Sequence, residues 1–234
     1  MWTFPRARRT LRVLIPAAPL ALTVGVLPAY GAAPPAPAPL TCATASGPYQ
    51  REVEELMELE VDGVQSPADC QAIQRYQESH LVVPADGSAG AITYTALYWE
   101  WAQNYPEQLR GCPEREGRVA CVDLSHQIMW VAADGKVVFT PVAIRSGRAA
   151  LPTRTGWFRV EERRRDDWST LYNSPMTFSQ YFSGGQAIHG VYNNLYEGPG
   201  SHGCVNLRHE DAKHLWTALR QGDAVYVWGK KPGT

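Results

Sequence analysis

The spacing of apolar and polar residues is helical between Tyr49 and about Tyr105. Apolar side chains recur at intervals of three or four positions, which places them along one face of a helix. They are Val53, Leu56, Met57 and Leu59, then Ala72, Ile73 and Tyr76, and then Leu97, Tyr98 and Trp101. Helix starts are expected after two similar turns, at Ser66-Pro67 and near Thr93. We therefore predict three short helices in this segment.

From Arg118 onward the pattern changes to one typical of strands. Short runs rich in β-branched and aromatic residues cover Val119 to Leu124, Ile128 to Ala132, Lys136 to Val142 and Trp157 to Glu162. Asp134-Gly135 provides a two-residue hairpin turn. A helical face returns at Glu210 to Arg220, followed by a last strand at Ala224 to Trp228. We predict an α+β protein, with a small helical module followed by a mainly β domain.

The first 33 residues have the order of a secretory signal peptide. Four arginines precede a 14-residue apolar stretch from Val13 to Val26, and small residues follow up to Ala33. The apolar stretch is too short to span a bilayer comfortably. We expect cleavage near Gly31 to Ala33 and a secreted, extracytoplasmic mature chain without a membrane span. Residues 34–48 are rich in Ala and Pro, which favours an extended linker.

The composition narrows the classes of function further. Hydrophobic residues make up 44% of the chain, which is enough to build a core. The 22 Lys and Arg residues nearly balance the 23 Asp and Glu residues, for a net charge of −1. Such a chain has no basic field with which to hold nucleic acid. We expect no nucleic-acid partner.

The five cysteines form an odd set, so at least one thiol has no partner within the chain. Cys112 and Cys121 are separated by nine positions that include a proline and a glycine, a spacing suited to a short bridged loop. Cys42 and Cys70 both lie in the N-terminal half. Pairing by proximity leaves Cys204 free, although the sequence alone permits other pairings.

Three of the six histidines lie close to Cys204 in the sequence: His189, His202 and His209. A thiol with the usual pKa of about 8.5 is mostly protonated at neutral pH, so a nucleophilic cysteine needs a base or a positive partner to hold the thiolate, and a histidine can be both. We expect Cys204 to react as a thiolate held in this way. We select His189 as the base, because it lies fifteen positions before Cys204 and the segment between them includes glycines that allow the chain to loop back. His202 is assigned a supporting role. The amides of Gly203 and Cys204 are candidate donors to an oxyanion.

Two other readings of this cluster are open. A His-X-Cys sequence with a third histidine nearby resembles part of a zinc site, but structural zinc sites usually show four ligands in paired short spacings. Alternatively, Cys204 is a buried apolar thiol among core histidines, a reading that does not explain the adjacent glycine and serine. We expect neither a metal nor a cofactor.

The run Ser201-His202-Gly203-Cys204-Val205-Asn206, preceded by His189-Gly190, resembles the signature of the L,D-transpeptidase catalytic domain family. These are cysteine enzymes that remodel bacterial peptidoglycan. The resemblance extends from Cys121 to Gly229 and includes Ser146-Gly147 and the stretch from Pro152 to Gly156. It implies a mainly β-sandwich catalytic domain at 118–230, with the cysteine at the base of a cleft.

The resemblance also implies roles for single residues. Cys204 is the nucleophile, His189 is the base, and the carbonyl of Gly190 orients the imidazole. Asn206 and His202 support these residues, and Gly203 belongs to the catalytic set through its amide. Apart from the resemblance, we expect substrate contacts from Tyr181, Tyr192, Ser201, Asn206 and Arg208. For Tyr181 and Tyr192 the alternative is ordinary packing, because the exposure of a side chain cannot be read from the sequence. Many relatives carry arginine where this chain has Asn206, and here an arginine follows at Arg208 instead.

The helical segment at 49–106 resembles the peptidoglycan-binding module of many cell-wall enzymes. The resemblance is carried by the two turns Asp62-Gly63 and Asp86-Gly87 and by the Tyr76-Gln77 pair on the central helix. At the first turn, this chain has Ser66-Pro67 where the module usually has Gly-Pro. A three-helix spacer without a ligand is the alternative.

These resemblances imply an L,D-transpeptidase. Such an enzyme takes the acyl group of the third residue of a tetrapeptide stem, releases D-alanine, and transfers the acyl group to the side-chain amine of a diamino acid, which gives a 3-3 cross-link. The alternatives are an L,D-carboxypeptidase of the same fold and a non-catalytic cell-wall-binding protein. The expected partners are peptidoglycan stem peptides, with carbapenem-type β-lactams as covalent inhibitors. The expected location is the cell wall.

Overall fold

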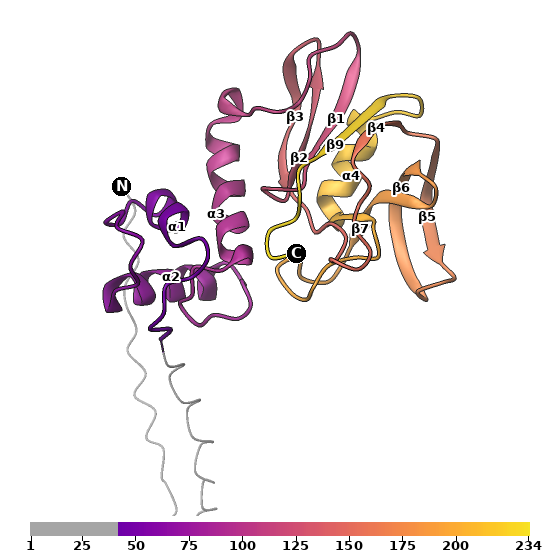
Figure 1. Cartoon of the computed structure of the whole chain (residues 1–234). Coiled ribbons are helices and arrows are strands. Elements are labelled where there is room, and N and C mark those ends of the chain that lie inside the picture. The colour runs from indigo at the N-terminus through magenta and orange to yellow at the C-terminus, as the bar shows by residue number, and fades with distance from the viewer. Residues whose placement is uncertain (1–41) are drawn as a thin grey trace, which may run out of the picture. The chain divides into compact units, whose positions relative to one another are not determined.

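A computed structural model describes residues 42–234 of the chain. The predicted signal peptide, 1–33, and residues 34–41 of the predicted linker lie outside these residues. The described part contains four α-helices, a short 3-10 helix and two β-sheets, and is therefore a mixed α/β structure (Figure 1). No helix in residues 42–234 is long and apolar enough to cross a membrane.

Three α-helices lie in the N-terminal part of the described chain. They are α1 (Gln50–Leu56), α2 (Pro67–Ser79) and α3 (Ala91–Asn104), and the 3-10 helix η1 (Pro106–Gln108) follows. The predicted start of α2 is confirmed, because Ser66 and Asp69 form a reciprocal capping box of 3.1 and 2.9 Å ahead of the helix. The third helix begins at Ala91, two residues before the position predicted.

The two Asp-Gly turns, Asp62-Gly63 and Asp86-Gly87, are built alike. In each turn the aspartate side chain accepts a hydrogen bond from the amide two residues later, at 2.7 and 2.9 Å. Each glycine has a positive φ, +80° and +75°, and donates its N–H to a buried side chain of the preceding helix. The acceptors are Glu54 of α1 at 2.8 Å and Gln77 of α2 at 2.7 Å. The similarity noted in the sequence is therefore a similarity of structure.

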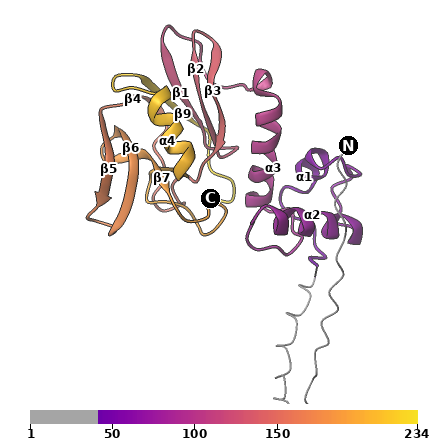
Figure 2. The same cartoon turned by 180° about the vertical axis from the view of Figure 1, so that it is seen from behind.

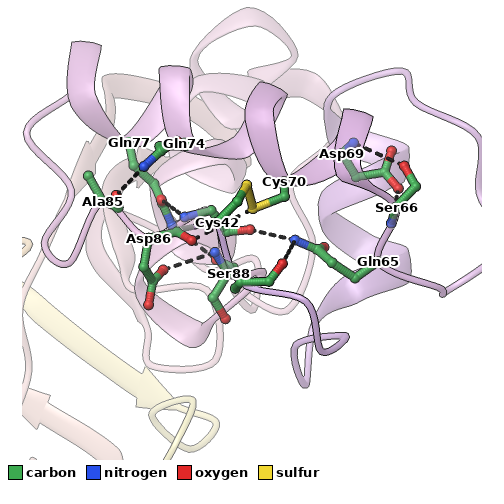
Figure 3. Close-up of a disulfide and its surroundings, with 12 residues drawn as sticks. Cys42, Gln65, Ser66, Asp69, Cys70, Gln74, Gln77, Ala85, Asp86 and Ser88 are labelled. Atoms are coloured by element: carbon green, nitrogen blue, oxygen red, sulfur yellow. Dashed lines mark hydrogen bonds between the residues drawn. A yellow bond between two sulfur atoms is a disulfide. The ribbon is translucent and has the colours of Figure 1, made fainter. Parts of the chain in front are cut away.

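A disulfide links Cys42 to Cys70 of α2, next to the second of these turns (Figure 3). The second disulfide links Cys112 to Cys121, so both predicted pairings are confirmed. Their Cα atoms are 5.9 and 5.6 Å apart, which is usual for a disulfide. Among the cysteines of the described chain, Cys204 alone has a free thiol.

In residues 42–234, nine strands form two sheets. The strands are β1 (Arg118–Asp123), β2 (Ile128–Ala133), β3 (Lys136–Ala143), β4 (Gly156–Arg159), β5 (Glu162–Ser169), β6 (Ser174–Ser183), β7 (Gln186–Val191), β8 (Val205–Arg208) and β9 (Ala224–Trp228). The first sheet has the order β3-β2-β1-β9-β4 and the second has the order β5-β6-β7-β8. Within them, β1 pairs with β9 in parallel, and β7 pairs with β8 in parallel.

The predicted strand from Trp157 to Glu162 is divided between the two sheets. β4 ends at Arg159, and β5 begins at Glu162 in the other sheet. Between them Val160 is buried, and its N–H donates to the carbonyl of Asp223 at 2.9 Å. The chain therefore crosses from one sheet to the other through the core.

One hydrophobic core joins both sheets to α4 (His209–Ala218). Figure 2 shows this helix from the side opposite to Figure 1, and it contacts β6, β7, β8 and β3. The core side chains from the two sheets and the helix include Val122, Met129, Val131, Phe182, Ile188, Val205, Leu207, Leu215 and Val225. Because Ile188 and Val205 point into this core, their neighbours in the same strands point to the opposite face.

An aromatic cluster joins α3 to the first sheet. Trp130 is buried there, packed among aromatic side chains of α3 and β9 that are half-buried. They include Tyr98, Trp99, Trp101, Tyr226 and Trp228. The indole N–H of Trp99 donates to the carbonyl of Pro141 in β3 at 3.2 Å. The helical segment therefore packs directly on the sheet.

Candidate active site

The parallel pair β7 and β8 places the predicted nucleophile and base on one face of the second sheet. Ile188 pairs with Val205, and both are buried in the core. His189 pairs with Asn206, so these two side chains leave from the other face. Cys204 lies two positions before Asn206, immediately ahead of β8, and takes the same side.

A cavity of about 400 Å³ lies over this face. Six of the residues predicted from the sequence line it: Cys204, His189, Asn206, Ser201, His202 and Tyr192. The other lining residues include Arg145, Tyr172, Met176 and Asn193. None of the residues that line it carries a carboxylate. The structure thus brings most of the predicted site together.

The turn that carries Cys204 is held by its own side chains. Ser201 Oγ donates to the carbonyl of Cys204 at 2.5 Å and accepts the N–H of Gly203 at 3.0 Å. Gly203 has a φ of +113°, and a Cβ at this position would collide with the side chain of Gln186. From the far side, Thr153 Oγ1 donates to the carbonyl of Gly203 at 2.9 Å. Glycine is required here, and the turn is rigid.

The N–H groups expected to stabilise an oxyanion differ in their availability. The Gly203 N–H is already bonded to Ser201, whereas the Cys204 N–H has no hydrogen-bond partner among the described residues. Of these two groups, only the Cys204 N–H is available to donate to an oxyanion in this structure.

His189 is buried and has one fixed tautomer. Its Nδ1 lies 3.1 Å from the carbonyl of Gly190, so Nδ1 carries the proton and Nε2 is left as an acceptor. Burial lowers the pKa of His189 to about 4, although the hydrogen bond to Gly190 acts in the opposite direction. At neutral pH the imidazole is therefore uncharged and able to accept a proton.

Burial also raises the pKa of the Cys204 thiol, and a hydrogen bond from the backbone of Ala187 opposes this only in part. The two pKa directions describe a neutral thiol and a neutral imidazole. This differs from the thiolate held by histidine that the sequence suggests. The two pKa shifts have the same cause, because burial takes the charged form of each group out of water.

Aromatic rings form part of the cavity wall. Tyr192 is 69% exposed and stacks on His209 at 4.5 Å, and Tyr172 stacks on His202 at 4.0 Å. Tyr181 does not line this cavity; its hydroxyl donates to Asp167 at 2.6 Å, and burial, reinforced by this bond, raises its pKa to about 12. Tyr172 was not predicted, because nothing in the sequence places the β5–β6 turn beside Cys204.

Arg208 also lies outside the cavity lining. Its guanidinium stacks on Trp99 at 4.4 Å and donates to the Tyr196 hydroxyl at 3.3 Å. These contacts link α3 to the segment between β7 and β8. The arginine that does line the cavity is Arg145, which sequence reasoning missed. Arg145 immediately precedes Ser146-Gly147, and this pair is the one sequence feature that could have pointed to it.

The described residues contain no group of three or more His, Cys, Asp or Glu side chains arranged to hold a metal ion. Cys204 and the histidines near it therefore do not form such a group in residues 42–234.

Comparison with known proteins identifies the family. The sequence model of the L,D-transpeptidase catalytic domain (YkuD) matches residues 117–227. The crystal structure of an L,D-transpeptidase from Stackebrandtia nassauensis is 34% identical to this chain, covers 84% of it and is covered over its entire length, with a TM-score of 0.57. The chain belongs to the L,D-transpeptidase family.

Further solved structures of L,D-transpeptidases also match. One from Xylanimonas cellulosilytica is 26% identical, with 84% of this chain and 100% of that chain covered and a TM-score of 0.47. L,D-transpeptidase 3 from Mycobacterium tuberculosis, solved with a faropenem-derived adduct, is 20% identical over 48% of this chain and 60% of that chain, with a TM-score of 0.43. No curated protein matches the chain.

Proposed function

We propose that this L,D-transpeptidase family member acts on peptidoglycan stem peptides, with Cys204 as its nucleophile. The observation that carries the proposal is the free thiol in a carboxylate-free cavity that also contains a buried, unprotonated histidine. Acyl transfer by a thiol requires a base close to the nucleophile. The pairing of β7 with β8 supports this, because it brings His189 and the turn that carries Cys204 to the same cavity.

In the first half-reaction, Cys204 attacks the carbonyl of the third residue of a tetrapeptide stem while His189 Nε2 takes the thiol proton. Because the thiol starts neutral, proton transfer accompanies the attack. The Cys204 N–H donates to the oxyanion of the tetrahedral intermediate. The intermediate expels the amine of D-alanine, which receives the proton from His189, and a thioester remains.

In the second half-reaction, the side-chain amine of a diamino acid attacks the thioester. His189 accepts a proton from this amine, and the proton then returns to the sulfur as the thioester opens. The product is a 3-3 cross-link. Water in place of the amine gives a trimmed stem, which is L,D-carboxypeptidase activity, and the masses of the products distinguish the two.

The Gly190 carbonyl serves this chemistry by fixing the imidazole tautomer, in place of a carboxylate. Ser201, Gly203 and His202 hold the turn, and Tyr192 and Asn206 contact the substrate. Carbapenem-type β-lactams are proposed to acylate the same sulfur, since their strained amide presents a carbonyl to the same nucleophile.

We further propose that the chain is exported and that its parts divide as the sequence suggests, with a peptidoglycan-binding-like helical module at 49–106 and the catalytic domain at 118–230. Two disulfides support an oxidising, extracytoplasmic location. The repeated Asp-Gly turns support the module.

The test is the substitution Cys204→Ala. We expect it to abolish D-alanine release from a tetrapeptide stem and to abolish the carbapenem adduct seen by intact mass. Serine at the same position is the matched control for folding, because it preserves the size of the side chain. Turnover or adduct formation that persists in Cys204→Ala excludes Cys204 as the nucleophile.

A further inference from the structure

Arg145 is the sole arginine or lysine among the described residues that line the Cys204 cavity. It follows β3 and forms an antiparallel bridge with Asn206, with N–O distances of 2.9 and 3.0 Å in the two directions. Residues directly opposite one another in such a bridge project from the same face. The side chain of Arg145 therefore belongs to the same face as His189 and Cys204, although it is far from both in the sequence.

The guanidinium of Arg145 is fixed by the loop that follows β7. Nη1 donates to the carbonyls of Asn194 and Glu197 at 2.9 and 2.8 Å, and Nη2 donates to Asn193 Oδ1 at 3.2 Å. One N–H of Nη2 remains unused. Nε is buried and has no hydrogen-bond partner. The charge is thus held in place before any ligand arrives.

No carboxylate in residues 42–234 forms an ion pair with Arg145: the ion pairs of the described chain involve other residues. Burial lowers the pKa of Arg145, and the attraction of the Glu197 carboxylate opposes this only in part. A half-buried cation is costly unless it is paired. A cavity with a fixed arginine and no acid is complementary to an anionic ligand.

We propose that Arg145 binds a carboxylate of the donor stem peptide and so positions the scissile carbonyl at Cys204. This inference rests on the function proposed above. A planar guanidinium matches a carboxylate better than any other side chain does. Two carboxylates of a tetrapeptide stem are in question, that of the terminal D-alanine and that of the acidic second residue.

The experiment measures cleavage of three stems by the full chain: one with both carboxylates free, one with an amide at the terminus, and one with an amide on the second residue. The released group is D-alanine, or D-alaninamide for the stem with the terminal amide, so the common tripeptide product is quantified by mass. For the wild type we expect kcat/KM to fall about 10- to 100-fold with one of the two amides, the size of a lost charge-assisted hydrogen bond. The stem that shows this fall identifies which carboxylate is bound. In Arg145→Gln the same amide should change kcat/KM by less than about twofold.

The ratio between two stems, measured in one variant, separates binding from structure. Arg145 also holds the 193–197 loop, so Arg145→Gln slows every stem to some extent, but a purely structural role leaves the ratio unchanged. Arg145→Lys retains the charge and should retain part of the preference. Arg159→Gln, on an exposed residue of β4, is the control and should leave the ratio at the wild-type value.

Two results overturn the proposal: a wild type that does not distinguish the three stems, and an Arg145→Gln variant that keeps the full preference. Failure of the proposed function looks different. In that case Cys204→Ala retains turnover, or the wild type cleaves none of the stems, and the anchor is rejected together with the function.

Discussion

His189 is the proposed base, and its surroundings determine its protonation state. It is 6% exposed, and its pKa of about 4 lies below the ordinary value of 6.5 because burial disfavours the imidazolium. A base must be unprotonated before it takes the thiol proton, so activity depends on the fraction of neutral His189. We expect kcat/KM for D-alanine release to remain level from pH 7 to about 5 and to fall near pH 4. An acid limb near pH 6.5 contradicts this prediction.

The same shift affects stability. The unfolded chain takes up a proton at this histidine as the pH falls below 6.5, whereas the folded chain does so only near pH 4. The free energy of unfolding is therefore lost through this window, by roughly 3 kcal/mol at its end. Urea denaturation of the wild type and of His189→Gln at pH 7, 5 and 4 should show a smaller loss in the variant.

At this scale, sequence reasoning finds residues that share a motif and misses those that meet across strands. Cys204, His189 and Ser201 are recognised because their spacing and neighbours have chemical meaning. Arg145 reaches the site only through its pairing with Asn206, and no local pattern indicates that pairing. For the same reason Arg208, which is closer to Cys204 in sequence, was selected although it packs against Trp99.

At the scale of elements, α3 depends on the sheet on which it packs. Trp99 donates a hydrogen bond to Pro141, and its ring accepts the stacked guanidinium of Arg208. We expect Trp99→Ala to lower the free energy of unfolding by about 2 to 3 kcal/mol, somewhat less than for a fully buried tryptophan. Chemical denaturation measures the loss.

Trp157 is the matched control for this prediction. It is 47% exposed on β4, so Trp157→Ala should cost less than about 1 kcal/mol. Equal losses in the two variants contradict the view that α3 is held mainly by Trp99.

The elements that the sequence predicts are those with a clear apolar period. β1, β2, β3, β9 and α4 lie close to their expected positions, and the Asp134-Gly135 turn has positive φ at both residues. β5 was missed because Glu162–Ser169 is a charged run that pairs only with β6 and has no buried residue. β8 has four residues, too few for any period to be visible.

At the scale of the whole molecule, the two disulfides divide five cysteines into four that are bonded and one that is free. Thiol titration of the folded, unreduced protein should therefore find one thiol, and alkylation followed by peptide mapping should place it at Cys204. Two or three titrated thiols contradict the pairing. The reaction should be slow at neutral pH, because burial raises the pKa of this thiol.

A second measurement compares the free energy of unfolding after removal of each disulfide. The Cys42–Cys70 loop spans 28 residues and the Cys112–Cys121 loop spans nine. In the chain-entropy model, the longer loop contributes about 3 to 4 kcal/mol and the shorter one somewhat less. The double serine variant of the first pair should therefore be the less stable of the two.

The aromatic cluster between α3 and the first sheet also limits where this chain can be divided to build a hybrid protein. Tyr98, Trp99 and Trp101 pack against Trp130. Separation of α3 from the sheet would therefore expose aromatic side chains on both. A hybrid that joins residues 118–230 to a foreign N-terminal segment without α3 would expose Trp130 and its aromatic neighbours to water, which favours aggregation. A hybrid that keeps α3 together with the first sheet retains this packing.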